Sequence, residues 1–252
     1  MGSNDAAAVR EALKELGCAE RARHHERFFQ TQPGGYGEGD RFLGVTVPQQ
    51  RAVARRFRDL APPAVEELLR DPFHECRMTA LCILIDQFER GDAEQRRAIV
   101  EWYVAHLDYV NNWDLVDTSA PKILGPALLS EYTGEGTPEL LWALARSGHL
   151  WRERTAVLAT LAFIRAGVFS PTLELADCHL RHPHDLMHKA IGWMVREIGK
   201  RDREVARSFL LKRYQEMPRT MLRYAIEHFP ETERQSFLKG TAVGVDGPVG
   251  LP

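Results

Sequence analysis

No apolar run in this sequence approaches the roughly 20 residues that a helix needs to cross a bilayer. The chain opens on a polar, alanine-rich stretch, without the apolar segment of a signal peptide. Both absences argue against a membrane partner and against secretion. We therefore expect a cytoplasmic protein.

The four cysteines form no Cys-x-x-Cys pair, so neither a zinc ribbon nor a disulfide framework is indicated. Reduced, buried thiols are expected instead. The sequence also lacks the Gly-x-Ser-x-Gly motif of a serine hydrolase. No Gly-Lys-Ser/Thr follows the glycine-rich segment, which excludes a P-loop.

Net charge is also small, at −2, so bulk charge gives no sign of a nucleic-acid partner. Its distribution is uneven, because residues 146–223 hold 15 Lys and Arg against 8 Asp and Glu. Such a bias can focus a positive field on one face. The alternative is that these residues only form the solvated faces of helices.

Apolar residues recur at three- and four-residue spacing along most of the chain, which predicts helices almost throughout. No alternation of strands and helices appears, so an all-α protein is expected. The periodic stretches are Val47–Leu60, Ala64–Leu69, Cys76–Phe88, Ala98–Leu107, Leu115–Leu129, Pro138–Ala145, Trp151–Ile164, Leu173–Leu180, Leu186–Ile198 and Arg203–Tyr214.

Weak internal repetition accompanies the helical pattern. Short segments that begin with a basic residue and continue with small or apolar residues start at Arg77, Arg154, Lys189 and Arg219. Repeats of about 35–45 residues are typical of HEAT-like solenoids, in which helix pairs stack into an ARM-type superhelix with a concave face. Loose spacing of this kind also occurs in other helical proteins. We predict one HEAT-like repeat domain over residues 1–240 and a flexible tail over residues 241–252.

Residues 31–45 depart from the helical pattern and are rich in turn formers. A loop or short β-hairpin with Tyr36 at its tip fits this composition. Such an insertion either contacts a partner or is a plain connection.

Trp113 and Asp117 are four residues apart and share a face if the segment is helical. An indole beside a carboxylate suits a flat, cationic ligand, through cation–π contact and charge. The alternative is a core Trp beside an Asp that caps a helix or pairs with a cation. Asp114 either supports Asp117 or caps the helix.

Four histidines cluster at His179, His182, His184 and His188. His184 and His188 have the spacing of two metal ligands on one helix. Because Pro183 interrupts the run and no further motif completes a site, neither a metal nor another cofactor is expected.

Several of these segments together resemble the bacterial DNA alkylation repair glycosylases built from HEAT-like repeats. The resemblance covers about residues 8–238, and its blocks occur in the family's order. They are Phe28-Phe29, Phe42-Leu43-Gly44-Val45-x-Val47-Pro48-x-x-Arg51, Trp113-Asp114-Leu115-Val116-Asp117, Trp151-x-x-Arg154-x-Ala156 and Lys189-Ala190-Ile191-Gly192-Trp193-x-x-Arg196-Glu197.

The resemblance implies an N-glycosylase that removes N3- and N7-alkylated purines from double-stranded DNA, without flipping the base. Asp117 would be the catalytic carboxylate, and Trp113 and Trp193 would contact the sugar and backbone of the lesion nucleotide. Arg154 would hold a phosphate. Phe28 stands where family members carry a tyrosine of the cleft.

DNA contacts are thus expected from residues on both sides of the Trp113–Asp117 block. They are Arg154, Lys189, Trp151, Phe28, Tyr36 and Arg196. A monomer associated with the nucleoid is expected. Two alternatives remain open: a related protein that binds damaged or branched DNA without catalysis, and a HEAT scaffold that binds proteins.

Overall fold

The computed structural model describes residues 4–243, and over this range the chain is helical with no β-strand. The all-α prediction is therefore confirmed, and the helices have the HEAT-like arrangement that the repetition predicted. No helix in the described range has the length and apolar content needed to span a membrane. The predicted flexible tail lies outside the described residues from residue 244 onward.

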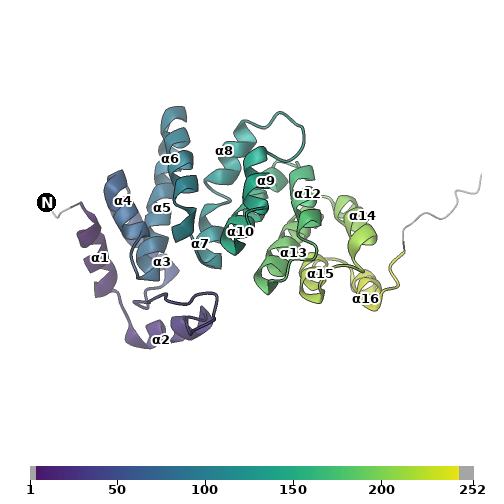
Figure 1. The fold of residues 1–252 in the computed structure, drawn as a ribbon, viewed down its shortest axis with the longest axis horizontal. Helices are drawn as coiled ribbons and strands as arrows, with labels where there is room; N and C mark the ends of the chain where they lie inside the picture. Colours follow the sequence, from purple (N-terminus) through teal and green to yellow (C-terminus); the bar gives the residue numbers. More distant parts are fainter. Residues whose placement is uncertain (1–3, 244–252) are drawn as a thin grey trace, which may run out of the picture. The chain divides into compact units, whose positions relative to one another are not determined.

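The chain divides into two compact units, residues 1–127 and 128–252, with the boundary inside one short helix, α8 (Leu124–Ser130). Whether both act as one repeat domain stays a prediction. The helices of unit 1 are α1 (Ala6–Glu15), α2 (Ala19–Phe28), α3 (Val47–Arg56), α4 (Pro62–Leu69), α5 (His74–Arg90), α6 (Ala93–Ala105), the 3-10 helix η1 (Leu107–Tyr109) and α7 (Trp113–Ser119) (Figure 1).

Helix α5 is the centre of unit 1 and packs against α1, α3, α4, α6 and α7. It is buried around most of its circumference, including polar positions at its start such as His74, Glu75 and Arg77. Since buried polar groups need partners, this helix start is where a network of charged side chains is expected.

The glycine-rich segment between α2 and α3 is a loop, so the loop alternative is correct and the β-hairpin is not formed. A single isolated bridge links Arg41 to Phe73. Gly44 has φ +77°, and a methyl group there would lie 2.1 Å from the carbonyl oxygen of Cys18. Only glycine permits this backbone conformation and this close approach together. In Figure 1 the loop and α2 lie below the other helices of unit 1.

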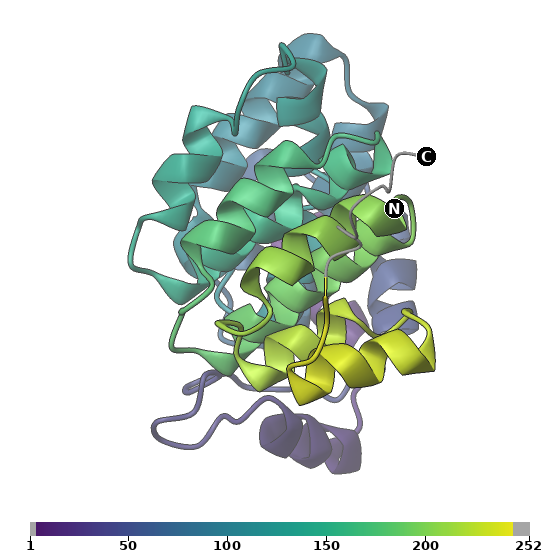
Figure 2. The same cartoon turned by 90° about the vertical axis from the view of Figure 1, so that its right-hand side faces the viewer.

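Unit 2 is organised around α13, which contacts α10, α11, α12, α14 and α15. Helices α14 and α16 of this unit face the viewer in Figure 2. The helices after α8 are α9 (Glu139–Ala145), α10 (Leu150–Ala159), α11 (Leu161–Arg165), α12 (Ser170–Cys178), α13 (Asp185–Gly199), α14 (Arg203–Arg213), α15 (Arg219–Ala225) and α16 (Glu231–Lys239).

Candidate functional site

Helix α7 begins at the Trp113–Asp117 block. The side chain of Asn112 caps it by accepting a hydrogen bond from the N–H of Trp113 at 2.8 Å. Leu115 and Val116 form the buried side of the helix. Trp113 and Asp117 are only partly buried, one turn apart. The sequence predicts that they share a face, and in the structure both side chains are partly exposed.

Aromatic side chains surround Trp113. Phe29 stacks on the indole, with ring centroids 5.5 Å apart and planes inclined by 16°. Phe28 meets the indole edge-on at 6.0 Å, and its side chain is 55% exposed. The hydroxyl of Tyr36 donates a hydrogen bond to the carbonyl of Phe28 at 3.0 Å. Three predicted contact residues, Phe28, Tyr36 and Trp113, thus lie together in unit 1.

A cavity of about 530 Å³ opens beside this aromatic group, lined by Phe28, Trp113 and Asp114 together with residues at the start of α3. Its walls are mainly apolar, and Asp114 adds a carboxylate. Tyr36 is not a free loop tip, because its hydroxyl bonds the carbonyl of Phe28 and its side chain packs against the buried cluster that contains Phe29 and Phe42.

His74, at the start of α5, lies beside the aromatic group and contacts two carboxylates. Its Nδ1 lies 2.9 Å from Asp40 and its Nε2 lies 2.8 Å from Asp114. Arg77 and Asn112 also donate hydrogen bonds to Asp40. The loop, α5 and α7 are thereby joined through one buried network.

Burial alone lowers the pKa of His74, but the charge and hydrogen bond of Asp114, with the hydrogen bond to Asp40, outweigh it and raise the pKa to about 9. Burial works to raise the pKa of Asp40, and His74 and Arg77 more than reverse this, so it is lowered. His74 is therefore an imidazolium that donates from both nitrogens. Sequence reasoning missed His74 and Asp40, because nothing in their spacing links them to Asp114.

Glu75, next along α5, fixes the end of the loop. Its carboxylate is 1% exposed and accepts hydrogen bonds from the backbone N–H groups of Leu43, Gly44 and Val45. These three residues belong to the Phe42–Arg51 block of the sequence. The backbone of this block is thus held in place by a buried carboxylate from α5.

In unit 2, the predicted contact residues lie on α10 and α13. Arg154 is buried, and its Nη1 donates to the carbonyl of Leu186 in the first turn of α13. Trp151 is buried too, at 7% exposure. Its side chain therefore stabilises the packing of α10 and offers little surface to a ligand. Lys189 is half exposed and lies 2.7 Å from Asp185.

Trp193 is partly buried, and its Nε1 donates to Glu197 at 3.1 Å. Arg196 is ion-paired with Glu227. Unit 2 therefore brings Arg154, Lys189, Trp193 and Arg196 onto two packed helices, each with a partner in the same unit. Because Asp117 belongs to unit 1 and Trp193 to unit 2, their joint site stays a prediction.

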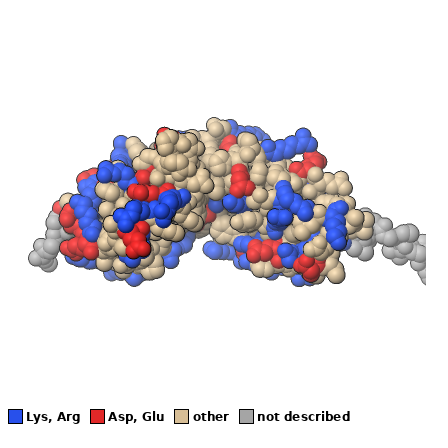
Figure 3. All heavy atoms as spheres, turned by 90° about the horizontal axis from the view of Figure 1, so that it is seen from below, with Lys and Arg blue, Asp and Glu red and all other residues tan. Residues whose placement is uncertain are grey.

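The basic bias of residues 146–223 is reduced by such pairs, which also include Arg213 with Asp177 and Arg207 with Glu233. On the faces that Figure 3 shows, blue and red side chains are intermingled in each unit. Both pairs are partly buried, so they neutralise part of the positive charge of this region.

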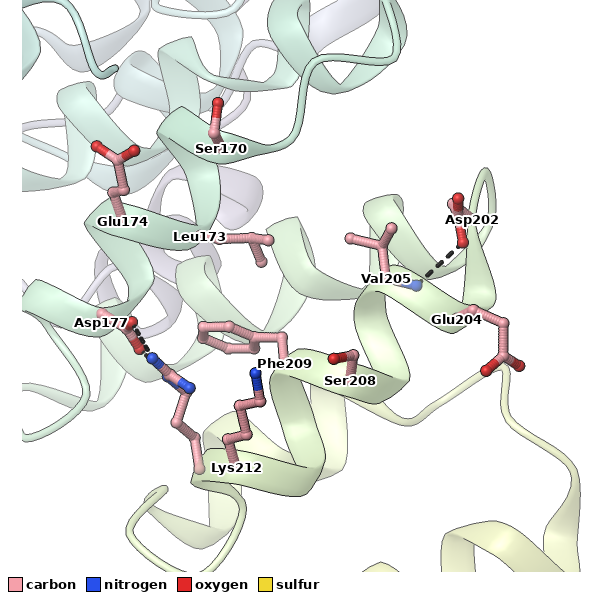
Figure 4. A pocket seen from close by; sticks show the side chains of 11 residues that line it. Ser170, Leu173, Glu174, Asp177, Asp202, Glu204, Val205, Ser208, Phe209 and Lys212 are labelled. Atoms are coloured by element: carbon pink, nitrogen blue, oxygen red, sulfur yellow. Dashed lines mark hydrogen bonds and ion pairs between the residues drawn. The ribbon is translucent and has the colours of Figure 1, made fainter. Parts of the chain in front are cut away.

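A groove of about 600 Å³ lies between α12 and α14 (Figure 4). Phe209 and Leu173 form its floor, and Lys212 and the Asp177–Arg213 pair lie at one end. No residue predicted from the sequence lines it.

Two comparisons with known proteins found matches. The model of a family described as DNA alkylation repair enzyme matches residues 9–229. A solved structure, described as a predicted DNA alkylation repair enzyme from Enterococcus faecalis, superposes with a TM-score of 0.66. It is 15% identical, and the match covers 86% of this chain and 98% of that one, which shows a common fold. No curated protein matches the sequence. Since the family model spans most of the chain, this protein belongs to the DNA alkylation repair enzyme family.

Proposed function

We propose that the protein is a DNA glycosylase that removes N3- and N7-alkylated purines from double-stranded DNA. The observation that carries the proposal is the pairing on α7 of a partly accessible indole, Trp113, with a partly accessible carboxylate, Asp117, one turn away. The aromatic group around Trp113 and the family membership support it.

The chemistry follows from the lesion. Alkylation at N3 or N7 makes the purine cationic and a good leaving group, so breaking the N-glycosidic bond mainly requires stabilising an oxocarbenium-like sugar. The carboxylate of Asp117 would stabilise this positive charge and orient the attacking water. Trp113, and Trp193 from unit 2, would contact the sugar and backbone, so the base need not leave the stack.

Phosphates would be held by Lys189 and Arg196 of unit 2, whose side chains are 41% and 19% exposed. Arg154 is 4% exposed and bonded to Leu186, so it would reach a phosphate only after its side chain leaves these contacts. DNA carrying alkylated purines is then the partner, and a monomer in the nucleoid region of the cytoplasm is the expected form. Trp151, which is buried, would hold α10 in position and with it Arg154.

The test is release of 7-methylguanine from methylated duplex DNA. The Asp117→Asn variant should lose about 100-fold or more in the rate of release while it keeps DNA affinity. Glu101→Gln, an exposed carboxylate on α6, is the matched control and should retain the wild-type rate. Equal release by Asp117→Asn would remove Asp117 from the mechanism. A wild-type protein that binds branched DNA but frees no base would instead support the non-catalytic alternative.

A further inference from the structure

Glu153, His179 and His182 form a compact group in unit 2. Glu153 lies on α10, His179 caps the end of α12, and His182 lies in the turn that leads to α13. One candidate ligand atom from each residue lies within 4.8 Å of the other two. The two imidazole rings are 5.6 Å apart, centre to centre, and inclined by 71°. Three separate segments thus direct metal-binding groups to one point.

Two members of the group are almost fully buried. Glu153 is 7% exposed and His179 is 5% exposed. The Nε2 atom of His179 has no hydrogen-bond partner among the residues that the structure describes. Buried polar atoms are nearly always paired, because an unpaired one loses its hydration without compensation. The unused lone pair or proton of His179, next to a buried carboxylate, points to a ligand.

We propose that Glu153, His179 and His182 bind a divalent transition-metal ion, with Zn²⁺ as the best fit. Two imidazoles and one carboxylate are a donor set that Zn²⁺ accepts, and three protein ligands leave a fourth position for water. Imidazole favours Zn²⁺ over Mg²⁺, which prefers oxygen ligands in octahedral geometry. The proposal is independent of the glycosylase proposal, because none of these residues has a part in it.

Binding requires a small rearrangement of the turn before α13. The Nε2 of His182 lies 2.8 Å from Glu153, and its Nδ1 accepts a hydrogen bond from the N–H of His184 at 3.0 Å. Coordination through Nε2 moves the ring proton to Nδ1, so the bond from His184 is lost. The amide of His184 should therefore change its NMR shift when metal binds, whereas amides of unit 1 should not.

The test is a titration of the purified, metal-stripped full-length protein with ZnCl₂ by calorimetry, with MgCl₂ as a second titrant. We expect one Zn²⁺ per chain and no saturable Mg²⁺ binding. The His179→Leu and Glu153→Gln variants should each bind Zn²⁺ at least 10-fold more weakly. His106→Ala is the matched control, because His106 also faces a glutamate, Glu66, at 3.4 Å, but no third metal-binding residue completes the pair within the part of the chain that the structure describes. Its affinity should equal that of the wild type.

Thermal unfolding separates a metal site from a merely structural role. Zn²⁺ should raise the Tm of the wild type but not that of His179→Leu, since a ligand stabilises only the state that binds it. Cys178→Ser controls for the exposed neighbouring thiol. The proposal is overturned if the wild type shows no saturable Zn²⁺ binding, if His179→Leu and Glu153→Gln bind as tightly as the wild type, or if Cys178→Ser abolishes binding.

Discussion

The Nε2 atom of His74 lies 2.8 Å from a carboxylate oxygen of Asp114, and this contact joins the first turn of α5 to the first turn of α7. Asp114 follows Trp113 directly and precedes Asp117 by one turn. The second nitrogen of His74 holds Asp40 in the loop. The position of α7 in unit 1 therefore depends on a buried, positively charged imidazole.

Folding stability should fall as pH rises through the folded pKa of His74. That pKa is about 9, compared with about 6.5 for an unfolded histidine. The contribution is therefore complete below pH 6.5 and is lost progressively up to and beyond pH 9. Its maximum is about 3 kcal/mol, by the relation of 1.36 kcal/mol to one pKa unit. Urea unfolding at a series of pH values measures it.

The His74→Gln variant is the control for this pH dependence. It should be less stable than the wild type at pH 6, because Asp40 and Asp114 lose their cationic partner. Between pH 6.5 and 9.5 its stability should change less than that of the wild type. If the two proteins lose stability in parallel over this range, His74 is not the titrating group.

Gly192 allows α13 and α15 to pack closely in unit 2. A methyl group at this position would lie 2.5 Å from the carbonyl oxygen of Met221 and 2.5 Å from Cβ of Tyr224. Backbone is among the obstructing atoms, so the helices would have to separate. We expect Gly192→Ala to lower the free energy of unfolding by about 1–3 kcal/mol, measured by urea denaturation.

Gly199, on the same helix, supplies a matched control. A methyl group there would lie 3.4 Å from Cβ of Ala206, an ordinary contact. Gly199→Ala should therefore be neutral or stabilising by up to about 1 kcal/mol, because alanine favours the helix. Equal destabilisation by both substitutions would show that helix contact at Gly192 is not the cause.

Most of the helices could be predicted from the sequence, because the helical spacing of their apolar residues can be recognised without knowledge of the fold. This spacing does not show the breaks inside Leu115–Leu129 and Trp151–Ile164, where the apolar pattern continues although the chain forms two helices in each case. The predicted stretches also leave out α1, α2, α15 and α16. In α2, Ala22 is the one buried residue of a mostly charged helix. Such a helix has few apolar residues from which a helical spacing could be recognised.

The candidate site was predictable where its residues are close in the chain. Trp113 and Asp117 were paired by helical spacing alone. His74 was not, because 34 and 40 residues separate it from Asp40 and Asp114 and only the fold brings them together. Local spacing carries no information about such contacts. For the same reason, Glu153 was not grouped with the histidine cluster, because 29 residues separate it from His182.

Lys189 should contribute to DNA binding through charge. Its side chain is 41% exposed and forms an ion pair with Asp185. The hydrogen bond from Lys189 is the main cause of the lowered pKa of Asp185. If Lys189 contacts a phosphate, Lys189→Ala should weaken duplex binding and reduce the slope of log K against log salt by about 0.9. Lys14→Ala is the matched control, since Lys14 forms a similar exposed pair with Glu11 on α1. Fluorescence anisotropy at several salt concentrations measures both slopes.

Phe28 should contribute to DNA affinity and little to folding stability. With 55% of its surface exposed, it contributes less to the core than Phe29, which is 8% exposed. Phe28→Ala should therefore cost at most about 1 kcal/mol of stability. It should weaken binding to methylated duplex DNA several-fold, because an exposed aromatic surface beside Trp113 is lost. Phe28→Tyr keeps the ring and should retain binding. A Phe28→Ala protein that binds like the wild type would place the DNA away from this end of α2.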